Sequence, residues 1–277
     1  MAAPQPPDNR PRNLIDAIAC FRRGELENCK KLLALTRLQT PRGVHPEVIL
    51  YEGLCERRLG NRQRAVEILQ EAARVAPTEP QVLLAYGLAL IETGRTEWGL
   101  DMLRSAVHAS GEAPTFRHEF YLQNGIALYR EKYLEAAITS LRKAQRFAQE
   151  ASTYRLLGYI LLEQEKHEEA LAVANEGLSH HMYDPELHHI AGLALAMGRD
   201  LVAAAQSLIR AVEINPHNGE PLHSLGLCFE SMGDGARALR AYQQCLTLPC
   251  RPSVHQDARD RVARLTGHAD ITGLGAG

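Results

Sequence analysis

The sequence predicts an all-α protein in which pairs of helices stack into a right-handed superhelix, an α-solenoid. The main observation is an internal repeat: shifting the sequence against itself by 34 residues places glycines and prolines on glycines and prolines. A period of this length is typical of helix–turn–helix units that bury their apolar faces against neighbouring units. The positions related in this way are Pro46 and Pro80, Gly53 and Gly87, Gly60 and Gly94, and, nearer the C-terminus, Gly158, Gly192 and Gly226.

Composition narrows the class of protein further. The formal net charge of -2 over 277 residues argues against binding nucleic acid through phosphate contacts. The N-terminus lacks the apolar segment and cleavage-like site of a signal peptide, and no apolar run is long enough to span a membrane. We therefore expect a cytoplasmic protein.

Seven helix pairs follow a short N-terminal tail. Residues 1–12 are rich in proline and polar side chains, so we expect them to be disordered. In the pairs, apolar residues recur at helical spacing, a glycine usually marks the turn and a proline often closes the unit. The units are expected at about 13–41, 46–77, 80–111, 118–149, 151–182, 185–216 and 219–249.

Two features interrupt or end this pattern. After Gly111 the register slips by four residues, and we interpret residues 112–115, which include Pro114, as a longer connector. A final helix is expected over 252–266, where apolar residues form one stripe, and it is suited to cap the array. The glycine-rich residues 267–277 are expected to be disordered.

The repeats resemble the tetratricopeptide repeat. Its pattern is roughly W-x2-L-G-x2-Y, then A-x3-F, then P. The last unit matches best, with Leu225-Gly226-x2-Phe229 and Ala238-x3-Tyr242, although Leu222 stands where the pattern has Trp. The resemblance covers about 235 residues. It implies a scaffold that binds proteins, with the first helix of each pair lining the inner face of the superhelix.

The resemblance also implies which residues line that inner face. In the family they lie three residues before and one residue after the conserved glycine of each first helix, one turn apart on one face. The first pairs are aliphatic, which favours an apolar partner segment, and the Lys/Asn clamp of chaperone-tail binders is missing. The expected groove residues are Leu50, Leu54, Leu84, Leu88, Leu122, Ile126, Arg155, Tyr159, His189, Leu193, His223 and Leu227.

One first helix is apolar on all sides, over residues 82–91. Such a helix is normally buried all round, and its neighbours in the stack are expected to cover only part of it. Three kinds of cover are open: a partner's amphipathic helix or apolar strand, the chain's own tail, or closure of the superhelix on itself. We favour the partner.

The sequence predicts no catalytic, cofactor-binding or metal-binding residues. His189 and His223 are 34 residues apart, so stacking would place them side by side. Placed in this way, they could bind one metal ion or one acidic group together. We favour the alternative that they are two partly solvated groove histidines, because no thiol or carboxylate completes a set of metal ligands. The six cysteines lack a C-x-x-C pair and are expected to be reduced, buried thiols.

These observations predict a non-enzymatic scaffold or adaptor that holds an apolar peptide or helix of a partner within a larger assembly. The alternative is a dedicated chaperone or assembly factor that shields a secretion- or pilus-type subunit. The two differ in lifetime, because a scaffold stays in the final complex. Exposed apolar repeat ends also leave a homo-oligomer open, whereas neither nucleic acid nor a membrane span is expected.

Overall fold

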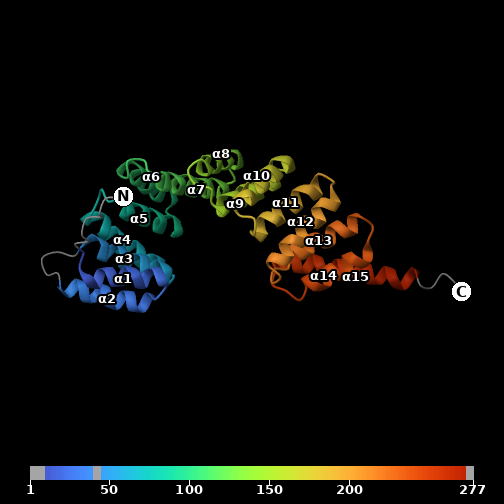
Figure 1. Ribbon diagram of the computed structural model, residues 1–277, viewed down its shortest axis with the longest axis horizontal. Helices are drawn as coiled ribbons and strands as arrows, with labels where there is room; N and C mark the ends of the chain where they lie inside the picture. The colour runs from blue at the N-terminus through green and yellow to red at the C-terminus, as the bar shows by residue number, and fades with distance from the viewer. Residues whose placement is uncertain (1–9, 40–44, 273–277) are drawn as a thin grey trace, which may run out of the picture. The chain divides into compact units, whose positions relative to one another are not determined.

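The structure, a computed structural model, describes residues 10–39 and 45–272, with side chains described as far as residue 267. Over these residues it contains fifteen α-helices and no strand (Figure 1). The predicted tail residues 1–9 and 273–277 lie outside the described ranges. The helices are α1 (Arg12–Arg23), α2 (Leu26–Gln39), α3 (Pro46–Arg58), α4 (Arg62–Val75), α5 (Pro80–Glu92), α6 (Thr96–Ala109), α7 (Pro114–Arg130), α8 (Leu134–Gln145), α9 (Ala151–Glu163), α10 (His167–His180), α11 (Pro185–Met197), α12 (Leu201–Ile214), α13 (Glu220–Ser231), α14 (Gly235–Cys245) and α15 (Pro252–Thr272).

The helices pack as pairs, which confirms the predicted all-α repeat fold. Apart from α7, the first helix of a pair contacts the second helix of the same pair, and it also contacts helices of the adjacent pairs. Thus α11 packs against α12, α10, α9 and α13. The last helix, α15, packs against both helices of the final pair and takes the place of a further first helix.

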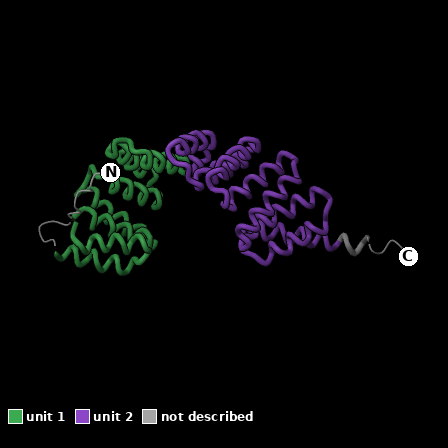
Figure 2. The backbone as a smooth tube through the Cα atoms, in the orientation of Figure 1, with its two compact units in different colours: residues 1–127 green, residues 128–277 purple. Residues whose placement is uncertain are grey.

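The chain divides into two compact units, residues 1–127 and 128–277 (Figure 2). The division falls inside α7, which the sequence does not predict. Each unit has its own apolar core. In the first unit one cluster joins α1, α2 and α3, and a second joins α3, α4 and α5. In the second unit a cluster runs through α12, α13, α14 and α15.

The helix ends follow from local chemistry. Proline is the first residue of α3, α5 and α11. Its lack of an N–H costs no hydrogen bond there, because a backbone N–H at the first helical position has no acceptor within the helix. Asp184 and Asp234 cap α11 and α14 by accepting a hydrogen bond from a backbone N–H of the first turn. Turns within pairs need a left-handed residue, and Gly60 supplies it between α3 and α4 with φ of 84°. The turns from α7 to α8 and from α9 to α10 lack glycine, and there Lys132 and Glu165 take this conformation, with φ of 66° and 60°.

Two boundaries differ from the sequence prediction. The expected connector at residues 112–115 is shorter than predicted, because α7 begins at Pro114 rather than near residue 118. Proline is well suited to the first position of a helix, and four extra residues add about one helical turn. The register slip therefore lengthens a helix instead of a loop. The final helix continues to Thr272, beyond the predicted end at 266, so Gly267 does not terminate it.

Small residues allow the helices of a pair to cross closely. At the crossing of α5 and α6, a Cβ atom on Gly99 would lie 2.6 Å from the carbonyl oxygen of Gly87. A Cβ atom on Gly87 would lie 2.8 Å from the carbonyl oxygen of Gly99. These are contacts with backbone, which no change of rotamer relieves. The crossing therefore requires glycine on both helices.

We expect Gly99→Ala to lower the free energy of unfolding by about 1–3 kcal/mol, because the two backbones must move apart. Gly235→Ala is the control: at the start of α14 its Cβ would meet only Leu265 Cδ2, at 3.8 Å. This control should be neutral or slightly stabilising. Urea unfolding followed by circular dichroism measures both, and equal stability of the two variants would contradict the crossing as described.

Candidate functional site

The twelve residues expected to line the inner face fall into two groups of different burial. All six residues that follow the conserved glycine by one position are half-buried. Of the six that precede it by three positions, Leu50, Leu122 and His189 are buried, with exposed fractions of 3%, 9% and 3%. Leu84, Arg155 and His223 are half-buried. The half-buried residues of the first group are Leu54, Leu88, Ile126, Tyr159, Leu193 and Leu227.

Two of the buried residues, Leu50 and His189, pack between successive first helices. His189 on α11 contacts Tyr159 on α9 and Ser224 on α13, the neighbouring first helices on either side. Leu50 belongs to the core cluster shared by α3, α4 and α5, and Leu54 packs against the same cluster. Side chains held in this way stabilise the stack and offer little surface to a partner. Leu50, Leu122 and His189 are therefore core residues, in contrast to their predicted role as groove residues.

The apolar helix α5 is largely covered by its own neighbours. Seven of its 13 residues are buried, and it packs against α3, α4 and α6. Leu84 and Leu88 remain half-buried on its surface. The neighbouring helices therefore cover part of α5, and the outside cover that the sequence led us to expect has only the remaining surface to bury. What remains for a partner in the first unit is a narrow apolar strip.

The second unit has a clearer hollow on its first helices. Two adjoining depressions share Leu193 and Ala196 of α11 and Arg199 of the turn that follows. One extends toward Leu162 at the end of α9 and Met197. The other extends toward α13. We call this surface the α9–α11–α13 hollow, and its apolar lining consists of Leu162, Leu193, Ala196, Met197, Leu201, Leu208, Leu227 and Cys228.

Sequence reasoning identified only Leu193 and Leu227 of this lining. Ala196 and Met197 lie three and four residues after Leu193, on the same face of α11. Leu162 lies four residues after Gly158, as Ala196 lies four residues after Gly192. The helical spacing of the predicted groove residues, continued by one turn, would have found all three.

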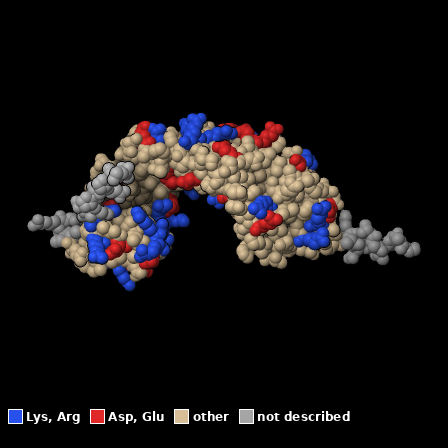
Figure 3. All heavy atoms as spheres, viewed as in Figure 1, with Lys and Arg blue, Asp and Glu red and all other residues tan. Residues whose placement is uncertain are grey.

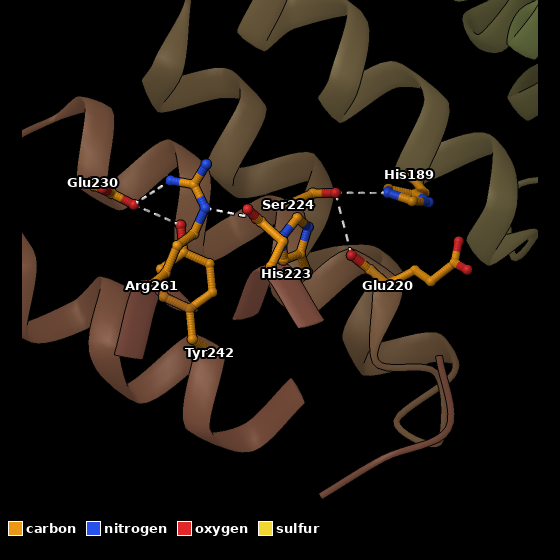
Figure 4. Close-up of polar contacts among 8 residues, drawn as sticks. His189, Glu220, His223, Ser224, Glu230, Tyr242 and Arg261 are labelled. Atoms are coloured by element: carbon orange, nitrogen blue, oxygen red, sulfur yellow. Dashed lines mark hydrogen bonds and ion pairs between the residues drawn. The ribbon is translucent and has the colours of Figure 1, made fainter. Parts of the chain in front are cut away.

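A chain of polar contacts closes the seam beside this hollow, and Figure 4 shows its part from His189 through Ser224 to Glu220. Tyr159 donates a hydrogen bond to Glu186 at 2.5 Å, and its hydroxyl lies 3.4 Å from His189 Nδ1. His189 Nε2 lies 2.9 Å from Ser224 Oγ, and that hydroxyl donates to the carbonyl oxygen of Glu220 at 3.2 Å. Both hydroxyl hydrogens are directed to other acceptors, that of Tyr159 to Glu186 and that of Ser224 to Glu220, so either oxygen can accept from the N–H of the neutral His189 ring.

This arrangement does not activate Ser224 as a nucleophile. A general base would have to accept the serine proton, whereas the Ser224 hydroxyl donates to the backbone carbonyl oxygen of Glu220. Burial lowers the pKa of His189 to about 4, which makes it a weak base near neutral pH. Burial, with the nearby Glu186 carboxylate, raises the pKa of Tyr159. The chain of contacts therefore holds α9, α11 and α13 together rather than performing acyl transfer.

His223 takes part in a different network, which joins α13 to α15. Its Nε2 lies 2.6 Å from Asp257 Oδ2, and Arg261 donates to the same oxygen at 2.6 Å. Arg261 also donates to Glu230, which accepts a further hydrogen bond from Tyr242 (Figure 4). Burial alone would raise the pKa of Asp257. Hydrogen bonds from Arg261 and His223 outweigh this effect and hold the pKa below its usual value.

The two histidines therefore do not share a metal or an acidic group. His189 pairs with Ser224 in one seam, and His223 pairs with Asp257 in the next. The favoured interpretation as partly solvated groove histidines is also wrong for His189, which is only 3% exposed. In the part of the chain that the structure describes, no three His, Cys, Asp or Glu residues are placed to hold a metal ion.

Charged side chains are mixed in sign over the surface seen in Figure 3, among a larger uncharged area. Many pair across successive repeats, as Arg57 does with Glu92 and Arg251 with Glu220. Exposed pairs of this kind contribute at most about 1 kcal/mol each. Within the described ranges, no helix combines the length and the apolar character that crossing a membrane requires.

Comparison with known proteins gives a consistent picture. Two family models, both described as "Tetratricopeptide repeat", match residues 52–114 and 155–219 and residues 222–261, together more than half of the chain. A curated relative, "BBSome complex member BBS4 homolog" of Drosophila melanogaster, is 27% identical over 154 residues. The match covers 49% of this chain and 30% of that protein, so the chain spans about a third of the relative's length.

Solved structures show the same fold at low sequence identity. The C-terminal part of a TPR repeat-containing protein from Cytophaga hutchinsonii superposes with a TM-score of 0.66 at 15% identity, covering 90% of this chain and 99% of that one. Pseudomonas aeruginosa pilF superposes with a TM-score of 0.63 at 18% identity, covering 78% and 96% of the two chains.

The burial of neutral His189 predicts a pH-dependent stability. The pKa is about 4 in the folded chain, against an ordinary value of 6.5 in the unfolded chain. Between these values the unfolded state binds more protons, so the free energy of unfolding falls as the pH drops below about 6.5. The loss from this residue is about 2 kcal/mol at pH 5 and does not grow below pH 4.

Urea unfolding at pH 7 and pH 5 tests this expectation by comparing the wild type with His189→Gln. Glutamine does not titrate, so the variant should lose less stability between the two pH values than the wild type does. Replacement of the exposed His217 by Gln is the control and should leave the wild-type dependence unchanged. An equal loss in wild type and His189→Gln would show that His189 is not held neutral.

Proposed function

This chain belongs to the tetratricopeptide repeat family, whose repeats form protein–protein interaction scaffolds, and we propose that its α9–α11–α13 hollow holds an apolar segment of a partner protein. The hollow is the observation that carries the proposal. Its apolar side chains come from three successive first helices and from α12, and Glu165, His167 and Arg199 are among the polar residues that also line it. An amphipathic helix or an extended strand with apolar anchors fits a surface of this kind.

The rigidity of the surrounding seam supports the proposal. The Tyr159–His189–Ser224 contacts hold α9, α11 and α13 in place beside the hollow before any partner binds. A preformed surface avoids part of the entropic cost of association. Each apolar side chain buried by a partner contributes roughly 1.5–3 kcal/mol, much of which the remaining cost of association offsets. We therefore expect moderate affinity.

Half-buried leucines of the first unit form a second, smaller surface in this proposal. Leu84 and Leu88 lie one turn apart on α5, and both keep part of their surface exposed. With Leu54 and Ile126, they are the predicted groove residues of this unit that burial leaves partly exposed. We propose that they contact the same class of apolar segment.

A scaffold within a larger assembly is favoured over a releasing chaperone. The curated relative is described as a member of a complex, the BBSome. The chaperone of a secretion- or pilus-type subunit remains the alternative, because both functions use an apolar surface. We also propose a cytoplasmic location and a non-enzymatic role, since all six cysteines are free thiols and the buried Ser–His pair is not activated.

The double variant Leu193→Asp with Met197→Asp tests the hollow. Both side chains line it from one face of α11, and Met197 is 39% exposed, so two carboxylates there should oppose an apolar partner with little effect on the core. We expect partner recovery from native cell extract to fall at least about tenfold, which corresponds to a loss of about 1.4 kcal/mol. Quantitative mass spectrometry of the captured proteins measures the loss.

The matched control is Val202→Asp with Ile209→Asp on the neighbouring helix α12. Those side chains are 66% and 41% exposed and do not line the hollow, so the partners should be retained. Melting temperatures of both variants check folding. If the α11 variant stays folded and keeps its partners, the binding surface lies elsewhere. Leu84→Asp with Leu88→Asp then reports separately on the smaller surface of α5.

A further inference from the structure

Two thiols meet in the seam between the first and second helix pairs. Cys29 lies on α2 and Cys55 on α3, and their sulfur atoms are 3.4 Å apart. Both side chains are fully buried. A disulfide bond is about 2.05 Å long, so the sulfurs need to approach by roughly 1.3 Å to form one. We propose that Cys29 and Cys55 are an oxidisable pair, which hydrogen peroxide joins into a disulfide between α2 and α3.

The surroundings keep the two thiols facing each other. They belong to one buried apolar cluster with residues of α1, α2 and α3. The residues that follow them, Lys30 and Glu56, form an ion pair across the same seam at 2.8 Å. This pair fixes the alignment of α2 against α3 at the height of the two sulfurs. Cys20, a third thiol in the cluster, instead lies 3.4 Å from the guanidinium of Arg23.

Access for an oxidant follows from the position of the pair in the array. The α1–α2 pair is the first repeat, and it packs on the repeat that contains α3. Repeats of a stack are joined only to their neighbours, so the seam between two repeats can open locally without unfolding the rest of the array. Opening of this seam would expose both sulfurs together. Closing it would return them to contact.

The chemistry balances with hydrogen peroxide as the oxidant. One thiol loses its proton, and its thiolate attacks a peroxide oxygen, which gives a sulfenic acid and releases hydroxide. The second thiolate attacks the sulfenic sulfur and expels its oxygen as hydroxide, forming the S–S bond. The two protons from the thiols neutralise the two hydroxides. Overall, two thiols and one peroxide become one disulfide and two waters.

The cross-link would tie the first repeat to the second. It joins residues 26 positions apart in sequence, and constraining a loop of that length in the unfolded chain stabilises the closed seam. Local opening of α1 and α2 would then be suppressed until a reductant restores the thiols. The pair would act as a reversible lock on the seam between these two repeats.

The test treats the full chain with hydrogen peroxide and maps its disulfides. Cys250→Ala serves as the background, because Cys245 and Cys250 also lie within hydrogen-bonding reach. We expect a peptide linking Cys29 to Cys55, with the loss of two hydrogens and recovery on reduction. Amide exchange in α1 and α2 should slow by about tenfold or more in the oxidised form.

Two variants separate this pair from other thiols. Cys55→Ala should abolish both the linked peptide and the slower exchange, whereas Cys228→Ala, a buried thiol of α13, should keep both. Linkage mapping on the background chain does not depend on either variant folding normally. If Cys29 and Cys55 both remain alkylatable after oxidation and unfolding, or if Cys29 links to Cys20, the proposal is wrong.

Discussion

The close approach of helix backbones at small residues is the constraint on which the rest of the structure depends. Gly87 and Gly99 bring α5 and α6 so near that a single added methyl group would meet a carbonyl oxygen. Gly192 is covered by Leu208 in the same way, and Gly226 by the ring of Tyr242. With these crossings fixed, each first helix packs one face against the second helix of its own pair. Its two edges face the neighbouring first helices, and its remaining face is not covered by the stack.

This division of faces decides what each residue of a first helix does. A residue three positions before the glycine reaches the seam, as His189 does between α9 and α13, and is buried when the neighbouring helices close over it. A residue one position after the glycine, such as Leu193, keeps an exposed part. The α9–α11–α13 hollow forms where such residues from successive helices meet others one turn further on.

The seams differ in chemistry although their geometry is alike. The first seam holds the Cys29–Cys55 pair, a later one holds neutral His189 with its serine and tyrosine partners, and the last holds the ionic network of Asp257 and Arg261. Buried groups of these kinds need partners, and the neighbouring repeat supplies each of them. The side chains that join the repeats are therefore also those that are sensitive to pH or oxidation.

The sequence by itself determined the helix-pair repeat and which residues share a face, because both follow from helical periodicity and from glycine and proline chemistry. It also placed Leu193 and Leu227 on the surface that lines the hollow. Only the tertiary structure decided that Leu50, Leu122 and His189 are buried, that α7 starts at Pro114 and that the chain divides within α7. Burial of this kind depends on how closely side chains roughly 30 residues apart in sequence approach one another in space. The repeat period predicts which residues are neighbours, but it does not give that distance.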